Sequence, residues 1–246
     1  MKRTLSFFAL TALLLTGCDK NPIIRQDAVA TGARVKFVHA YPDGPATGVN
    51  VLVNDRKLNG GVPTAAVPVP ALTFGSTFPA IGLDYAVVEP GNATVKVVVP
   101  ATATTPEVVA LTAPLTLEDN QYYSIIATGS PTPEALVLRD EFASVATNGA
   151  LAYARFLNLV PGTNYDIVVR GGATLATAIG YKAASPYFSL PAGPVVLDFR
   201  VPGTTTAVGS LTFNDLQPGR VYTFFTRGVV GRTGAQAPTL SNYRQR

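Results

Sequence analysis

Hydrophobic and polar residues alternate along short segments of this chain, as in β-strands that are buried on one face. The segment 195–201 places four apolar residues on one face and Asp198 and Arg200 on the other. The segment 94–99 repeats this pattern, with three valines opposite Lys96. No stretch keeps a helical period, and the chain contains 22 Gly and 20 Pro residues. The pattern therefore predicts an all-β protein whose short strands are separated by turns.

The chain also contains an internal repeat of four sequence blocks that recur in the same order. The matching blocks are 33–42 with 152–161, 49–53 with 165–169, 85–99 with 187–201, and 121–127 with 220–226. Strands spaced by roughly 8–12 residues favour one β-sandwich for each repeat. We therefore predict two tandem immunoglobulin-like β-sandwich modules, at 33–138 and 151–246, joined by a linker at 139–150.

The two repeats differ in length, and the extra residues suggest a loop. The offset between matching positions is 119 (156 − 37) in the first block and 102 (187 − 85) in the third. The first repeat thus carries 17 extra residues, which we place between Arg56 and Asp84. Inserted loops on rigid scaffolds often bind ligands, so Phe74 and Phe78 become candidate binding residues. The favoured alternative is a loop that covers a sheet edge or packs on the neighbouring repeat.

The first seventeen residues have the pattern of a signal peptide. Lys2 and Arg3 precede an apolar stretch that is shorter than the roughly 20 residues of a membrane-spanning helix. Leu15-Thr16-Gly17-Cys18 then resembles the lipobox of bacterial lipoproteins. We expect cleavage between Gly17 and Cys18, lipidation of the Cys18 thiol with fatty acids such as palmitate, and a tether at 18–32. A plain secretory signal peptide is the alternative, and Asp19 does not decide between inner and outer membrane.

Removal of the predicted signal peptide lowers the net charge of the chain. Without Lys2 and Arg3, 17 basic residues face 15 acidic residues, and the basic residues are scattered rather than clustered. This distribution gives no electrostatic footprint for nucleic acid. Cys18 is the only cysteine, so the mature protein cannot contain an internal disulfide. Its stability must come from a hydrophobic core, which a 47% share of hydrophobic residues can supply.

Candidate catalytic chemistry is sparse. The chain has one histidine, His39, whose counterpart in the second repeat is Asn158. Both residue types can satisfy backbone groups where a strand meets a turn, so a structural role is expected. We find no nucleophile-elbow, zinc-protease, P-loop or dinucleotide-binding motif. We therefore expect no catalytic residues, no metal, no cofactor and no enzymatic activity.

The carboxylates and tyrosines have structural interpretations as well. The adjacent pairs Glu118-Asp119 and Asp140-Glu141 lie in turns or a linker, where we expect them to be solvated. Asp43 belongs to a Pro-Asp-Gly turn, which favours a local Asx turn over a calcium ligand. Most tyrosines occupy repeat-equivalent strand positions, so we expect them to pack in the core rather than stack on sugars.

Several of these segments resemble a known family. The stretches FVHAYPDGPATGVNVLVN, PGNATVKVVV and LEDNQYYSIIATG are similar to the DUF4397 family, a domain of unknown function common in bacterial lipoproteins. The second repeat shows a weaker form, which lacks the Asp-Gly-Pro-Ala turn. The resemblance implies a β architecture and a location in the cell envelope, and it supplies no catalytic residues.

The expected function is that of a non-enzymatic envelope lipoprotein, held to a bacterial membrane by its N-terminal lipid. Sandwich modules on a tether commonly present loops to a partner, here a glycan or another envelope protein. The alternative is a structural spacer or assembly subunit of the envelope that has no soluble ligand.

Overall fold

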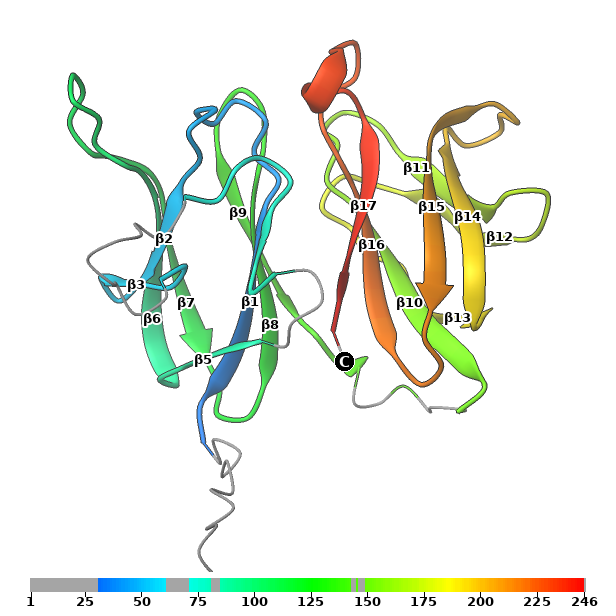
Figure 1. The fold of residues 1–246 in the computed structure, drawn as a ribbon, viewed down its shortest axis with the longest axis horizontal. Helices are drawn as coiled ribbons and strands as arrows, with labels where there is room; N and C mark the ends of the chain where they lie inside the picture. Colours follow the sequence, from blue (N-terminus) through cyan, green and yellow to red (C-terminus); the bar gives the residue numbers. More distant parts are fainter. Residues whose placement is uncertain (1–30, 61–70, 81–84, 143–144, 146–148, 246) are drawn as a thin grey trace, which may run out of the picture. The chain divides into compact units, whose positions relative to one another are not determined.

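In this computed structural model, each half of the chain folds as two β-sheets that enclose a hydrophobic core (Figure 1). The structure describes residues 31–60, 71–80, 85–142, 145 and 149–245. The predicted lipidation site Cys18, the residue Gly17 before it and the tether as far as residue 30 lie outside the described residues. The prediction of an all-β fold with two β-sandwich modules is confirmed.

The first module contains an inner sheet and an outer sheet. The inner sheet has the order β4-β1-β8-β9, with β5 also paired to β1, and the outer sheet has the order β3-β2-β6-β7. The strands are β1 Ala33–His39, β2 Asn50–Val53, β3 Arg56–Lys57, β4 Thr77–Phe78, β5 Ala86–Val88, β6 Gly91–Val99, β7 Val108–Leu117, β8 Tyr122–Thr128 and β9 Glu134–Arg139.

The second module repeats this arrangement. Its inner sheet has the order β13-β10-β16-β17, and its outer sheet has the order β12-β11-β14-β15. The strands are β10 Leu151–Asn158, β11 Tyr165–Val169, β12 Thr174–Ile179, β13 Phe188–Pro191, β14 Gly193–Arg200, β15 Ala207–Leu216, β16 Val221–Arg227 and β17 Thr239–Arg244, with a short 3-10 helix at Gly234–Gln236. The matching strand orders agree with the internal repeat seen in the sequence.

The centre of each inner sheet is a parallel pair, β1 with β8 and β10 with β16, whereas the other pairs are antiparallel. Parallel strands usually need both faces covered, and these four strands are almost entirely buried. On one face their apolar side chains enter the core of their own module, where Phe37 faces the first core and Phe156 the second.

The opposite faces of the two inner sheets share a third cluster, which we call the inter-module cluster. Its buried members are Val38, Ala40, Ile126, Leu157, Leu159, Phe225 and Tyr243. Residues 31–246 accordingly form a single unit. The alternating pattern predicted strands with one solvated face, but the inner strands differ because the neighbouring module covers that face.

The extra residues of the first module are divided over several places. Strand register aligns Val51 with Ile167, an offset of 116, so three of the 17 residues already lie in the turn between β1 and β2. Thr77 pairs with β1 at the place where Ala184 pairs with β10, so these two residues are equivalent and the offset between them is 107. It falls to 102 at Val88. The prediction of one insertion between Arg56 and Asp84 is therefore wrong for those three residues.

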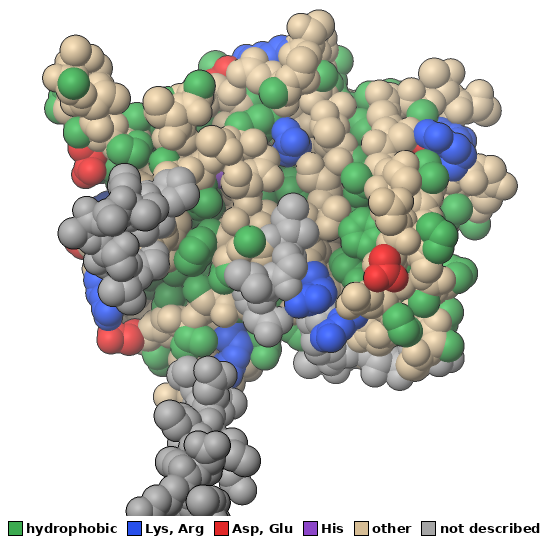
Figure 2. Space-filling view, viewed as in Figure 1, with side chains coloured by type: hydrophobic (Ala, Val, Ile, Leu, Met, Phe, Trp, Pro, Cys, Tyr) green, Lys and Arg blue, Asp and Glu red, His purple; other side chains and the backbone are tan. Residues whose placement is uncertain are grey.

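None of the described segments forms a helix that is long and apolar enough to cross a bilayer. On the face drawn in Figure 2, Lys and Arg side chains lie at several separate places among polar and apolar atoms.

Candidate functional site

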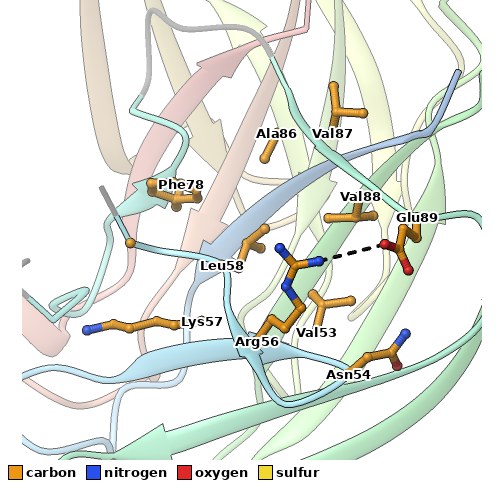
Figure 3. Close-up of a pocket in the computed structure, with 11 residues that line it drawn as sticks. Val53, Asn54, Arg56, Lys57, Leu58, Phe78, Ala86, Val87, Val88 and Glu89 are labelled. Atoms are coloured by element: carbon orange, nitrogen blue, oxygen red, sulfur yellow. Dashed lines mark ion pairs between the residues drawn. The ribbon is translucent and has the colours of Figure 1, made fainter. Parts of the chain in front are cut away.

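A groove opens along one side of the first module, between the edge of the outer sheet at β3 and the edge of the inner sheet at β4 and β5 (Figure 3). We call it the edge groove. Its volume is about 360 Å³, which lies within the ~300–1,000 Å³ typical of ligand pockets. Its lining residues are Val53, Asn54, Arg56, Lys57, Leu58, Gly60, Phe78, Ala86, Val87, Val88 and Glu89.

A tight hairpin forms the outer-sheet side of the groove. Asn54 and Asp55 have positive φ values of 49° and 61°, as a two-residue type I′ turn requires. Leu58 then donates its backbone N–H to Val51 at 2.7 Å, and buried Asn59 accepts the Val51 N–H at 2.8 Å. These bonds fix the segment after β3, so Leu58 packs against the first core while one side remains open to the groove.

The floor of the groove is apolar, and its mouth is charged. Leu58 and Val88 both pack partly against the first core and project between the two sheets. Arg56 reaches across the mouth to Glu89, with a 3.7 Å separation between Nη1 and Oε1. Their side chains are 84% and 85% exposed, and an ion pair this exposed contributes little to stability. Lys57, on the same short strand, has no ion pair among the described residues.

Backbone hydrogen-bonding groups also face the groove from both sheet edges. Arg34 donates its N–H to Gln121 beside β8, so it belongs to a non-hydrogen-bonded pair with Val87. The N–H and C=O of Val87 therefore point to the edge of β5 that has no paired strand among the described residues. By the same alternation, the bond from Leu58 to Val51 directs the N–H and C=O of Lys57 to the free edge of β3.

The two phenylalanines that the sequence singled out lie in different surroundings. Phe78 pairs with Phe37 through β4 and lines the edge groove. Phe74 instead contacts the second module, where the guanidinium carbon of Arg227 lies 4.7 Å from its ring centroid. The inserted segment thus combines the two alternative roles that the sequence suggested: Phe78 lines a groove, and Phe74 packs on the neighbouring repeat.

His39 is buried rather than placed in a pocket. Its side chain has no exposed surface, and neither ring nitrogen has a hydrogen-bond partner within the described residues. The backbone of Gly44 lies against the ring, where an added Cβ would come within 3.2 Å of Cε1. Burial lowers the pKa of His39 to about 4. A neutral, enclosed imidazole of this kind does not act as a catalytic base on an outside substrate.

The counterpart of His39 is fully satisfied. Asn158 donates to the carbonyls of Thr163 and Ile179 at 2.8 and 3.0 Å. Its oxygen accepts from the Val160 N–H at 3.0 Å and from Thr226 Oγ1 at 2.8 Å. In the first module Ala127 occupies the position of Thr226, so His39 lacks that hydroxyl donor.

Asp43 connects the two modules. Its carboxylate accepts from Arg232 Nη1 at 2.6 Å and from Ser130 Oγ at 2.7 Å. The hydrogen bond from Arg232 holds the pKa of Asp43 below its usual value. Gln236 adds a 2.7 Å bond to the Pro42 carbonyl. The sequence interpretation of Asp43 as a local turn residue is therefore replaced by an ion pair across the inter-module boundary.

A second link between modules is the buried polar cluster around Asp140, which is 4% exposed. Its carboxylate accepts from Tyr85 at 2.6 Å, from Ser124 at 2.7 Å and from Arg155 of the second module. Arg155 is 5% exposed and also donates to Thr223 at 3.1 Å. The prediction that Asp140 is solvated in a linker is wrong, because the second module covers it.

Electrostatics in this cluster favour a fixed charge state. Burial, followed by the field of Asp140, raises the pKa of Tyr85, so its phenol keeps the proton it donates. Burial alone lowers the pKa of Arg155, but the nearby Tyr243 and Asp140 outweigh that effect and raise it. Because Asp140 and Arg155 are almost inaccessible, the cluster stabilises the inter-module contact rather than binding substrate.

The remaining carboxylate pair is also divided between partners. Glu118 forms an ion pair with Arg139 at 3.2 Å, whereas Asp119 accepts the backbone N–H of Gly32. Within the residues that the structure describes, no three His, Cys, Asp or Glu side chains are grouped to hold a metal ion. Every aromatic side chain in the same ranges is buried or half-buried, including the tyrosines considered for sugar stacking.

Comparisons with known proteins follow the same division of the chain. A family model described as "Domain of unknown function (DUF4397)" matches residues 33–151 and again residues 152–244. Among curated proteins, none matches the chain.

Three solved structures align with most of this chain at low identity and low TM-score. One is CBMbc, a family CBM26 module of Eubacterium rectale Amy13K in complex with maltoheptaose (8% identity, TM-score 0.25, covering 86% of this chain and 97% of that chain). Another is the Bacillus anthracis TIE protein (9%, 0.24, 87% and 44%). The third is a candidate cell adhesion protein of Bacteroides fragilis (9%, 0.21, 87% and 98%). At TM-scores this low, the similarity says nothing about a ligand of this chain.

Proposed function

The chain belongs to the DUF4397 family, whose domain occurs in it twice, and from this premise we propose that the protein is a non-enzymatic interaction module of the cell envelope. It holds a protein partner through the edge groove of its first module, and it is attached to a bacterial membrane by lipid on Cys18.

The edge groove is the observation that carries this proposal. It combines an apolar floor at Leu58 and Val88 with a charged mouth at Arg56, Lys57 and Glu89. A concave apolar surface with a few polar groups is the common form of a binding site. The two other candidate sites, around the histidine His39 and around the carboxylate of Asp140, are closed to solvent. The groove is therefore the better candidate for contact with another molecule.

The position of Gly32, near the start of the described chain, supports display of the fold from a membrane. Gly32 joins the turn before β8 through a bond to Asp119 and a 3.0 Å bond from the Asn120 N–H to its carbonyl. The turns that carry Asp43 and Arg232 lie at the other end of the inner strands. A lipid on Cys18 would thus hold one end of the fold near the membrane and leave the opposite turns facing away.

Lipidation has a direct test. Cys18→Ala should abolish incorporation of labelled palmitate and move the protein out of the membrane fraction, because no other thiol is available. Asp19→Ala is the matched control and should keep both label and membrane attachment. Palmitate label that persists in Cys18→Ala would contradict the proposed anchor.

Groove binding is tested by site-specific photocrosslinking in cells. A photoreactive amino acid in place of Arg56 should give a discrete adduct with a partner protein, and adding Leu58→Gln should remove it. The same amino acid in place of Thr174, an exposed position on β12 of the second module, is the control and should give none. Equal adducts at both positions, or none in place of Arg56, would refute the binding role.

The second candidate function is a structural spacer of the envelope. It is favoured by the rigid connection of the modules through the Asp140 cluster and the inter-module cluster. A spacer needs no ligand, so its phenotype should be insensitive to Leu58→Gln and sensitive to changes at the inter-module boundary.

A further inference from the structure

The edge strand β5 carries only apolar side chains within its three residues, and Glu89 and Pro90 follow it directly. Exposed edges invite pairing with another strand, and proteins limit this with very short edge strands, proline, charged side chains or bulges. The other described edge strands carry such features: Arg56 and Lys57 on β3, Pro79 after β4, Pro114 on β7, Glu134 and Arg139 on β9, register shifts on β12 and β15, Pro191 on β13, and Arg244 on β17. The β5 segment, Ala86–Val88, has only small apolar residues and a regular register.

We propose that β5 receives an extended polypeptide segment of a partner protein, which adds a strand to the inner sheet and places apolar side chains in the edge groove. This inference rests on the proposed function and specifies its ligand. Strand addition of this kind takes affinity from main-chain hydrogen bonds and specificity from pockets for alternate side chains.

The backbone of β5 offers such a strand one pair of groups that have no backbone partner within the described ranges. The N–H and C=O of Val87 point away from β1, as the register and the Arg34 bond require. Because β5 is only three residues long, the added strand makes few backbone bonds. Most of its affinity must therefore come from side chains that enter the groove.

The pleat of the sheet determines which ligand side chains enter. Residues opposite Ala86 and Val88 would point between the sheets, toward the apolar floor that includes Leu58. The residue opposite Val87 would lie on the other face, beside a valine that is 42% exposed. The ligand is therefore expected to have apolar residues at alternate positions.

Charge and composition select among ligand classes. Arg56 is paired with Glu89, whereas Lys57 has no ion pair within the described ranges. An acidic ligand side chain near the mouth would complement Lys57. Phe78 is the only aromatic residue among the described residues that line the groove, and it is half-buried, so the groove offers little stacking surface for a glycan. The chemistry thus fits an extended peptide with alternating apolar residues and an acidic residue beside them.

Peptide selection on the full lipidated protein in detergent tests this inference. A library of random octapeptides is selected on the wild-type protein, and enriched sequences are then measured against variants. Val87→Pro removes the outward N–H without taking a bond from the β1–β5 ladder, so it should fold normally and bind about tenfold more weakly. Val87→Thr, which keeps the N–H, should bind within about threefold of wild type. Thermal unfolding verifies that each variant is folded.

A charge-swap cycle gives a second readout that does not depend on proline. Lys57→Glu should weaken binding of an enriched acidic peptide, and replacing the acidic peptide residue by lysine should restore it. N-methylation of the peptide residue opposite Val87 should weaken binding as Val87→Pro does, because it removes the matching donor.

The outcomes separate this inference from the proposed function. Peptides that alternate apolar residues and lose affinity with both Val87→Pro and Leu58→Gln support strand addition. Loss with Leu58→Gln alone keeps the groove as a binding site and overturns strand addition. Enriched peptides that neither variant affects, or no enrichment, overturn both. Self-association of the protein that Val87→Pro abolishes would identify a second copy as the occupant and overturn a foreign partner.

Discussion

At the scale of single residues, burial rather than residue type determines the roles of the ionisable groups. Lys36 occupies a polar position in the alternating pattern of β1, yet its side chain has no exposed surface. Asp198 lies on the polar face of β14 and is 3% exposed, because Arg170, Arg200 and Ser210 surround its carboxylate. The alternation correctly predicts which face each residue occupies, but the pattern cannot say what covers that face.

Asp140 shows the same limit more sharply. Its nearest basic partner, Arg155, lies on the first strand of the next module. Nothing in the local sequence around Asp140 indicates that contact, since it forms only when the two inner sheets meet. The sequence offers only one sign of a buried Asp140, which is the large apolar residue Phe142 two positions later. A solvated linker explains that sequence equally well.

His39 gives a prediction about pH. Its pKa falls from 6.5 to about 4 in the folded state because it is buried. Below pH 6.5 the unfolded chain binds a proton that the folded protein cannot accept, so stability is lost as pH falls from 6.5 toward 4. The shift corresponds to a loss of about 2–3 kcal/mol between pH 7 and pH 4.5. Urea unfolding at those two pH values measures it.

The second module supplies the control for this prediction. His39→Asn together with Ala127→Thr installs the pair that Asn158 and Thr226 form, and no histidine then remains in the chain. The double variant should show little pH dependence in that window. Asp43 and Asp198 contribute at lower pH, because their pKa values are held below the usual carboxyl value. An unchanged pH dependence in the double variant would remove His39 as its cause.

At the scale of strands and turns, most of the fold could be predicted from the sequence. The alternation identified strands at 94–99 and 195–201, which lie within β6 and largely within β14. The order of strands in the sheets was not accessible, because the parallel pairing of β1 with β8 joins segments more than eighty residues apart. The edge groove depends on that order, since β5 becomes an edge only through its place beside β1.

The β7 strand yields a prediction about edge protection. Asn54 and Thr94 bond to each other across β2 and β6, so Thr94 and Pro114 form a non-bonded pair and the Pro114 nitrogen faces the free edge. Proline therefore costs no bond there and blocks strand addition. Pro114→Thr should retain stability but promote association at high concentration, which sedimentation velocity in detergent would detect.

A neighbouring substitution controls for side-chain effects at this edge. Thr116→Val also changes an exposed β7 position, but its backbone N–H is present before and after the change. It should leave the sedimentation profile as in wild type. If Pro114→Thr remains as monodisperse as Thr116→Val, the proline is not what keeps this ten-residue edge unpaired.

At the scale of the whole molecule, the two modules behave as one structural unit rather than as domains on a flexible linker. The inter-module cluster removes apolar side chains of both inner sheets from water, and the Asp140 cluster and the Asp43–Arg232 pair bond the modules together. Apolar burial of this kind is the main favourable term in association. A groove on the first module is therefore held in a fixed orientation relative to the second.

This coupling predicts a single unfolding transition that depends on Asp140. Asp140→Asn keeps the shape of the side chain but leaves the buried Arg155 guanidinium without its counter-charge. Breaking a buried ion pair from one side typically costs about 3–5 kcal/mol. In a protein of this size that loss lowers the melting temperature by roughly 6–20 °C. Differential scanning calorimetry should show the shift, and a separate lower transition if the modules uncouple.

Asp198→Asn is the matched comparison for that measurement. Asp198 is as buried as Asp140 and is also paired with arginine, but both of its partners belong to the same module. The closer one, Arg170, directly follows β11 and is 56% exposed, and the second, Arg200, is 21% exposed. Water can therefore solvate Arg170 when the carboxylate is lost, so the decrease should be smaller and the transition should remain single. Equal losses for the two variants would mean that Asp140 acts as an ordinary ion-pair residue and that the inter-module contact does not depend on it.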